Sequence, residues 1–363
     1  MTTPVSLLDL GAAPLGSGET DPAAQDGCTT VRLAHAGVVH RVALDLPADA
    51  AGSRAVATAQ GASLAAVHRV GPDGAGIARW STLTQGVRLR DRPTGVLDVV
   101  APERWTHVRV LLSPPEPVSR VRVLGEVVPA PSLLEGRTVD VLAQESGAVL
   151  LDHSGAPWEG PVPSTPHRTG PQTLTGAGAS GTGWEPPSPS WSGGNAWAQW
   201  RLAAHAVVEH IEVDTRGLRH PPAGQASVSA MDATTADAHA PDTWFPLLEA
   251  AALRPGSRHR FSVGRPRPAT HIRLDLSGPG GLARLRLWGR LTGHGVEQVR
   301  LRWLNTLPHS GIAALLLPHG LTDHAVEAFT TARPYPTLDA AQAAAPQAEL
   351  FAHPTPFLRR TVA

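Results

Sequence analysis

The chain has 363 residues, of which 42% are hydrophobic and 17% charged, so it is long enough for two globular domains with separate cores. Its 31 basic and 31 acidic residues give a formal net charge of zero, so the global charge offers no argument for binding nucleic acid or an anionic membrane. All the basic residues are arginine, which excludes lysine Schiff-base chemistry, and the single cysteine, Cys28, excludes an intrachain disulfide and a thiolate metal cluster.

The N-terminal stretch MTTPVSLLDLGAAP has no basic region ahead of its short apolar run. No apolar run in the chain approaches the length of a membrane span. We therefore expect a cytoplasmic protein without a membrane partner.

Two pairs of segments show that the chain contains an internal repeat. THVRVLLSPPEPVSRVRVLG, which begins at Thr106, aligns without gaps on THIRLDLSGPGGLARLRLWG, which begins at Thr270, with nine of twenty positions identical. RLAHAGVVHRVALD, from Arg32, aligns with RLAAHAVVEHIEVD, from Arg201, in the same order and at nearly the same spacing. The spacing indicates a duplicated unit of about 165 residues, the size of a domain rather than of a solenoid repeat.

Each repeat is expected to be a β-structure. Apolar and polar residues alternate in VVEHIEVD, THIRLDL and ARLRLWG, and Gly and Pro interrupt these runs at short intervals. The pattern predicts an all-β fold of two tandem jelly-roll β-sandwich domains, the first at residues 1–130 and the second at residues 131–295.

One segment of the second repeat combines residue types that rarely occur together in one short stretch. TGWEPPSPSWSGGNAWAQWRL, residues 182–202, contains four tryptophans beside three prolines and several Gly and Ser. Tryptophan normally seeks burial, whereas a Pro/Ser/Gly run normally stays in solvent. A linker would not need the tryptophans.

A short α-helical tail is expected at residues 296–363. From Arg302 on, the sequence is rich in Ala and Leu at helical spacing. Thr322 can cap a helix that begins at Asp323, and Thr337 can cap another that runs through the following alanines.

The second repeat resembles a known family. Three short segments follow the order of three family patterns: TGWEPPS corresponds to DGWETRR, GNAWAQWRL to GHDW, and IEVDTRGL to VDTAHF. A fourth segment, HIRLDLSGPGGLARLRLWG, matches the family pattern HVRLNIYPDGGIARLRVYG in spacing. These patterns are those of the allantoicases, ureide hydrolases that release urea from allantoate and are built from two tandem jelly-roll domains of the galactose-binding-like type. The first repeat resembles the family more weakly.

The resemblance implies that residues 182–197 form an ordered wall of an active-site cleft, against which a small-molecule substrate binds. Within it, Glu185 is the candidate proton-transfer group and Asn195 the candidate hydrogen-bond donor to a carbonyl or oxyanion. Glu185 could equally be a loop carboxylate that accepts backbone hydrogen bonds. We expect no cofactor and no metal.

The candidate substrate-binding residues are Trp184, Trp197, Asp214 and Arg273. The tryptophans could stack on a ligand or only anchor the loop. Asp214, at a strand end, could bind a ligand or cap the following turn. Arg273 alternates with apolar neighbours, so it lies on a solvent face, pairs across strands or reaches the ligand.

Other ligand motifs are not found. The histidines are scattered, and no pair has the spacing of a metal site on one element. His271 lies in an alternating strand and has an equivalent, His107, in the first repeat, which favours a structural role. There is no nucleophile elbow, P-loop or dinucleotide fingerprint.

Departures from the family pattern leave two functional hypotheses open. Residues 186–188 are Pro-Pro-Ser where Thr-Arg-Arg is expected, residues 194–196 are Gly-Asn-Ala in place of Gly-His-Asp, and residues 216–218 are Arg-Gly-Leu in place of Ala-His-Phe. Losing the arginine pair and the histidines removes a carboxylate clamp and acid-base groups together. The first hypothesis is a divergent hydrolase of allantoate or a related small ureido or amide substrate. The alternative is a catalytically silent binding or assembly protein, or an enzyme repurposed for a different substrate in a biosynthetic pathway. A homo-oligomer is possible in either case.

The tail carries a second, weaker resemblance. LNTLPHSGIAALLLPHGLTDHAVEAFTTARPYPTLDAAQAAA is similar to the start of 2-oxo-4-hydroxy-4-carboxy-5-ureidoimidazoline decarboxylase, and FAHPTP contains a His-Pro pair like that family's. Most of the decarboxylase domain is absent, so we expect no decarboxylase activity.

Overall fold

The computed structural model describes residues 13–18, 28–45, 54–60, 81–84, 87–88, 94–113, 120–154, 184, 196–218, 222–235, 243–278 and 280–351. The described residues form two compact units. The second unit comprises residues 133–299, and the first unit combines the described residues up to 132 with residues 300–351.

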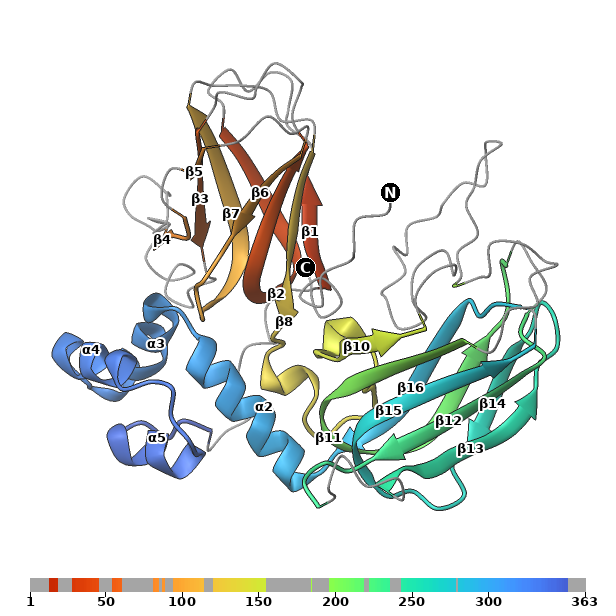
Figure 1. Ribbon diagram of the computed structural model, residues 1–363. Coiled ribbons are helices and arrows are strands. Elements are labelled where there is room, and N and C mark those ends of the chain that lie inside the picture. Colours follow the sequence, from red (N-terminus) through yellow and green to blue (C-terminus); the bar gives the residue numbers. More distant parts are fainter. Residues whose placement is uncertain are drawn as a thin grey trace, which may run out of the picture. The chain divides into compact units, whose positions relative to one another are not determined.

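The second unit is a β-structure built around one long strand. Its strands are β9 (Val139–Asp140), β10 (Val149–His153), β11 (Ala196–Asp214), β12 (Gln225–Met231), β13 (Phe245–Ala252), β14 (Arg258–Ser262), β15 (Pro268–Ser277) and β16 (Arg284–Leu291). They are paired in the order β13-β12-β15-β11-β16-β9, and β10 and β14 also pair with β11 (Figure 1). A 3-10 turn, Gln144–Ser146, connects β9 to β10.

β11 belongs to two layers. Its first part pairs with β15 and β10, and its second part, from Ala206, pairs with β16 and β14, with a register shift between Arg201 and Ala206. Alternate side chains of both parts lie in one hydrophobic core, among them Trp200 and Ile211. The two parts of β11 are therefore opposite walls of one β-sandwich, joined at the bulge.

The first unit repeats this topology. Its strands are β1 (Ala13–Gly18), β2 (Cys28–Asp45), β3 (Arg54–Gln60), β4 (Ser81–Thr82), β5 (Val87–Arg88), β6 (Thr94–Asp98), β7 (Arg104–Ser113) and β8 (Arg120–Val127). β2 pairs first with β7 and then with β8 and β6, as β11 does with β15, β16 and β14. Its register shifts between Arg32 and Gly37, the positions that the sequence alignment sets opposite Arg201 and Ala206. The repeat predicted from the sequence is confirmed at the level of backbone pairing.

Each unit closes its own core with residues that the alternating pattern predicts to face inward. In β15 the pattern gives Ile272, Leu274 and Leu276, all fully buried in the core of the second unit. In β7 it gives Val108 and Val110 in the core of the first unit. The predicted all-β sandwich fold is confirmed.

The helices follow the strands. They are α2 (Gly293–Thr306), α3 (His309–Leu316), α4 (Asp323–Thr331) and α5 (Leu338–Ala344), with 3-10 turns at Pro131–Leu133 and Leu317–His319. The Thr322 hydroxyl accepts from the Ala325 N–H and the Thr337 hydroxyl from the Ala340 N–H, which confirms both predicted N-caps.

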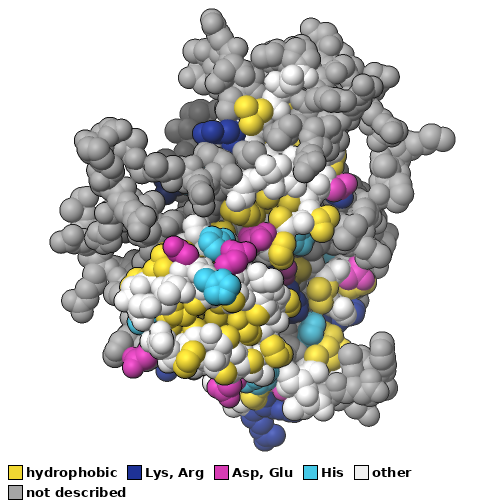
Figure 2. All heavy atoms as spheres, turned by 90° about the vertical axis from the view of Figure 1, so that its left-hand side faces the viewer, with side chains coloured by type: hydrophobic (Ala, Val, Ile, Leu, Met, Phe, Trp, Pro, Cys, Tyr) yellow, Lys and Arg dark blue, Asp and Glu magenta, His cyan; other side chains and the backbone are white. Residues whose placement is uncertain are grey.

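A third core forms among the helices of the first unit, and it includes Trp303, Ile312 and Phe329. The Arg333 guanidinium donates to backbone carbonyls at and just after the end of α2, including those of Leu304 and Asn305. Figure 2 shows histidine and acidic side chains close together among hydrophobic ones on one face of the molecule. Between α3 and α4, His309 Nδ1 lies 3.5 Å from Glu327 Oε2. Within the described part of the chain, no helix is long and apolar enough to cross a membrane.

Candidate functional site

The residues predicted for the site fall into three groups. Glu185 and Asn195 lie outside the described residues. Trp197 and Arg273 contact each other, whereas Trp184 and Asp214 are connected through the backbone of the turn before β16. Each group is described below.

Backbone contacts bring several chain segments to one end of the second unit. Trp184 exchanges two hydrogen bonds with Leu282, and the Ala283 N–H donates to the Asp214 carbonyl at 2.9 Å. Ala196, at the start of β11, pairs with Leu276, at the end of β15, only six residues before Leu282. The start and the end of β11, 18 residues apart in sequence, therefore lie at the same end of the sandwich.

Trp184 itself is a core residue. Its side chain is 2% exposed, and its ring lies edge-on to the His153 ring at 6.3 Å. Trp200 is fully buried as well. Both tryptophans therefore pack in the core of the second unit.

Trp197 and Arg273 meet on the outer face of the β11–β15 layer. The Arg273 guanidinium lies 4.7 Å from the centre of the Trp197 ring, and it binds both carboxylate oxygens of Asp275 at 2.9–3.0 Å. Arg273 and Asp275 are each about one third exposed, at 32% and 37%. An aromatic ring and a fixed guanidinium at a half-exposed position can hold a small polar ligand.

Asp214 faces the opposite way. Because its neighbour Val213 points into the core, the Asp214 carboxylate lies on the outer face of the β14–β11–β16 layer. It accepts from Arg216 Nε at 3.0 Å and Nη2 at 2.7 Å, and Arg258 Nε is 3.7 Å away. Desolvation raises the pKa of Asp214, but the hydrogen bonds and charge of Arg216 outweigh it and lower the pKa overall.

Glu212, two residues earlier, is the centre of a larger ion-pair group that the sequence analysis did not identify. Its side chain is only 5% exposed, with Arg260 Nε at 3.2 Å, Arg258 Nε at 3.4 Å and Arg286 Nη1 at 3.4 Å. The register explains the grouping, because Glu212 pairs with Arg260 on one side and with Arg286 on the other. Arg284 pairs with Asp214 across the same strands. We call Glu212, Asp214 and their five arginines (Arg216, Arg258, Arg260, Arg284 and Arg286) the arginine cluster.

Asp140 borders the arginine cluster from β9. Its Oδ1 accepts from the N–H groups of Leu142 at 3.2 Å and Leu287 at 3.0 Å. Burial raises its pKa to about 6, against the lowering effect of those two hydrogen bonds and of Arg286.

A separate polar group forms at the bulge of β11. The ring of His205 is 2.6 Å from Thr292 Oγ1 through Nδ1 and 3.2 Å from Asp232 Oδ2 through Nε2, and Gln298 Oε1 accepts from the His205 backbone N–H. Thr292 also accepts from the Gly295 N–H at 3.0 Å, so it caps α2. These contacts attach the first turn of α2 to the bulge.

His271, the histidine that recurs in both repeats, has a local partner. Its Nδ1 lies 2.8 Å from Thr270 Oγ1, and His107 Nδ1 lies 3.0 Å from Thr106 Oγ1 in the first unit. The repeated contact supports a structural role. Among the described residues there is no group of three or more His, Cys, Asp or Glu side chains that could hold a metal ion.

Comparison with known proteins identifies the family. The allantoicase repeat model matches residues 139–292, which include the turn and the arginine cluster described above. A probable allantoicase of Streptomyces avermitilis is 31% identical over 284 residues, covering 78% of this chain and 72% of the relative. The chain belongs to the allantoicase family. A probable allantoicase of Nocardia farcinica is also 31% identical, over 275 residues that cover 74% of this chain and 77% of the relative.

Solved structures support the allantoicase fold. The crystal structure of allantoicase from Saccharomyces cerevisiae superimposes with a TM-score of 0.54 at 19% identity, covering 75% of this chain and 80% of that one. A second allantoicase structure gives a TM-score of 0.54 at 18% identity, covering 78% and 91% of the two chains. These likenesses concern the fold alone.

Proposed function

We propose that this protein is a divergent ureide hydrolase of the amidinohydrolase type, which acts on allantoate or on a related small ureido or amide substrate. The observation that carries the proposal is the 31% identity to a probable allantoicase over most of both chains. The retention of two repeats with the same strand pairing supports it. The proposal includes a cytoplasmic location and allows a homo-oligomer.

The reaction adds water across a C–N bond and releases urea, so a proton has to reach the departing nitrogen. We assign that transfer to Glu185 and stabilisation of the developing oxyanion to Asn195. Their covalent neighbours, Trp184 and Ala196, lie at the same end of the second unit as Asp214, which supports a common site. Trp197 and Arg273 would bind the polar groups of the substrate.

A urea-release assay with allantoate tests the proposal. We expect release by the unchanged protein, and a fall in kcat of about 100-fold or more in Glu185→Gln, the size expected when a general acid or base is removed. Asn195→Ala should lower kcat by about 100-fold or more as an oxyanion donor does. Glu249→Gln, an exposed glutamate of β13, is the matched control and should leave release unchanged.

The outcomes separate the two functional hypotheses. If Glu185→Gln releases urea as fast as the unchanged protein, the role assigned to Glu185 is refuted, but the proposed hydrolysis is not. If no small ureide or amide is turned over, the hydrolase proposal fails. Calorimetric binding of allantoate without turnover would then favour the silent binding protein, which the departures at residues 186–188 and 216–218 already suggest.

We further propose that helices α3 to α5 share ancestry with the ureidoimidazoline decarboxylase without its activity. The sequence similarity spans α3, α4 and α5, and both predicted caps are present. A decarboxylation assay should show no release of carbon dioxide above background. Release above background would contradict this assignment.

A further inference from the structure

Part of the arginine cluster is not required by the fold, because the first unit builds the same strand pairing without Glu212, Arg258 and Arg260. It keeps an aspartate and two arginines, Asp45, Arg120 and Arg122, at the positions of Asp214, Arg284 and Arg286. In the first unit, Ala43 takes the place of Glu212, and it pairs with Val96, which takes the place of Arg260. Thr94 similarly takes the place of Arg258, opposite the end of the long strand. Val96 is 46% exposed, so this face of the first unit is an ordinary surface.

The carboxylates of Glu212 and Asp214 are buried, and they bind arginines that are more exposed to solvent. Glu212 and Asp214 are 5% and 12% exposed, whereas Arg216, Arg258 and Arg260 are 51%, 36% and 72% exposed. Arg258 bridges both carboxylates, at 3.4 Å and 3.7 Å. The buried acids therefore engage some of the N–H groups of each guanidinium, while the arginine side chains stay partly exposed to solvent.

Donors outnumber acceptors in the cluster. Each guanidinium has five N–H groups, whereas the two carboxylates provide only four oxygens, and each of the nearby acids Asp140 and Glu145 adds one carboxylate at most. Arg284 shows the consequence, because its Nη2 is buried and has no hydrogen-bond partner among the residues that the structure describes. A buried N–H group without an acceptor is unfavourable, and a charged one more so.

We propose that the arginine cluster is a binding site for a small oxyanion, a carboxylate or a phosphate, held by Arg284 together with Arg216 and Arg258. An oxyanion would supply the acceptor that Arg284 Nη2 lacks. Planar guanidinium groups bind the paired oxygens of such groups in a bidentate manner, and the buried acids orient the arginines before the ligand arrives.

This inference does not depend on the proposed hydrolysis, since binding of an oxyanion needs no turnover. We would record the arginine Nε–H signals of the full ¹⁵N-labelled chain while titrating acetate in one arm and inorganic phosphate in the other, in a buffer free of other oxyanions. Saturable shifts are expected for Arg284, Arg216 and Arg258. The arm with the lower Kd identifies the kind of oxyanion.

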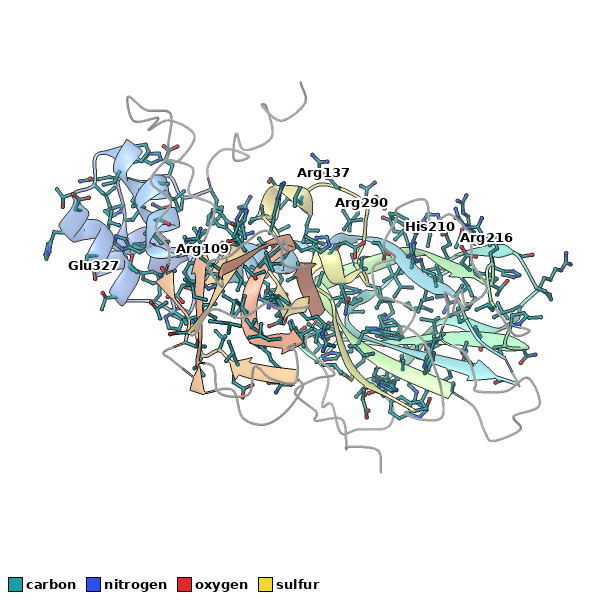
Figure 3. The ribbon with its side chains drawn as sticks, turned by 90° about the horizontal axis from the view of Figure 1, so that it is seen from above. Arg109, Arg137, His210, Arg216, Arg290 and Glu327 are labelled. Atoms are coloured by element: carbon teal, nitrogen blue, oxygen red, sulfur yellow. The ribbon has the colours of Figure 1, made fainter. Side chains whose placement is uncertain are left out.

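Matched variants test the assignment to these residues. We expect Arg284→Gln and Arg258→Gln each to weaken binding at least 10-fold. Arg290→Gln should leave Kd unchanged, since Arg290 lies on the same strand as Arg284 but contacts Thr138 and Glu209 instead. Figure 3 shows Arg290 and Arg216 at separate points along the second unit, with His210 between them.

Several results would overturn the proposal. Shifts that rise linearly without saturation in both arms would show only general screening of charge. Equal weakening in Arg290→Gln and Arg258→Gln would show that the cluster has no special role. If Arg284→Gln fails to fold, as its amide dispersion would reveal, Arg258→Gln and Arg216→Gln decide the outcome.

Discussion

Replacing Asp140 by asparagine should stabilise the second unit at neutral pH. Burial raises the pKa of Asp140 in the folded protein to about 6, from its ordinary value of 3.8 in the unfolded chain. Between these pH values the folded protein holds a proton that the unfolded chain releases, so stability falls as the pH rises from 4 to 6 and stays low above 6. A difference of about 2 pKa units corresponds to about 3 kcal/mol, which partial exposure of the side chain reduces to about 1–2 kcal/mol.

Asparagine removes this penalty and keeps the useful contacts. Its carbonyl oxygen can accept from the same two N–H groups, those of Leu142 and Leu287. We therefore expect the free energy of unfolding to rise by about 1–2 kcal/mol at pH 7.5 and to change little at pH 4.5.

Urea unfolding followed by tryptophan fluorescence at several pH values between 4 and 8 measures the effect. Asp152→Asn is the control, because Asp152 is exposed on the neighbouring strand β10, and its effect should stay within about 0.5 kcal/mol at every pH. The reasoning is refuted if Asp140→Asn lowers stability at pH 7.5. It is also refuted if the difference from the unchanged protein is the same at pH 4.5 and pH 7.5.

Three further predictions concern stability. Gly289→Ala should cost about 1–3 kcal/mol in urea unfolding, because the new Cβ would lie 2.3 Å from the Val207 carbonyl oxygen, whereas Gly264→Ala, with no atom within 4 Å, should cost little. Thr322→Ala should lose about 1 kcal/mol of protection from hydrogen exchange in α4, and unchanged protection would argue against the cap. Because the pKa of Asp214 is lowered in the folded protein despite its desolvation, the unchanged protein should lose stability as the pH falls below 3.8. Asp214→Asn should make the free energy of unfolding depend less on pH in this range, and an unchanged pH dependence would contradict this.

Most of the fold could be predicted from the sequence because its signals are local or duplicated. Alternation in THIRLDL identifies both β15 and the residues that face its core. The two N-caps depend on a threonine and the residues immediately after it. The repeat alignment needs only the sequence, and the matching bulges of β2 and β11 confirm it.

The site could be predicted only in part, because it depends on register and on the bend in β11. Trp197 and Asp214 were expected in one pocket, and the structure sets their side chains on opposite outer faces of the sandwich. The part of the site formed by Glu185 and Asn195 stays a prediction, since both lie outside the described residues.

The arginine cluster was missed for a related reason. Alternating charges at Arg258, Arg260, Arg284 and Arg286 were visible in the sequence. What was not visible is that β14 and β16 flank the same half of β11, which directs all four arginines toward Glu212 and Asp214. Strand neighbours that are distant in sequence cannot be derived from periodicity.

The two-layer course of β11 limits how this protein can change in length. Inserting or deleting one residue between His210 and Asp214 would exchange the two faces of this regularly paired stretch, turning Glu212 into the core and Ile211 out of it. Variation in this stretch is therefore restricted to substitutions, and length changes are tolerated only at the register shifts of β11 or in the connecting loops. A binding face could arise on one copy of a duplicated domain in this way, one side chain at a time, while the other copy kept the shared framework.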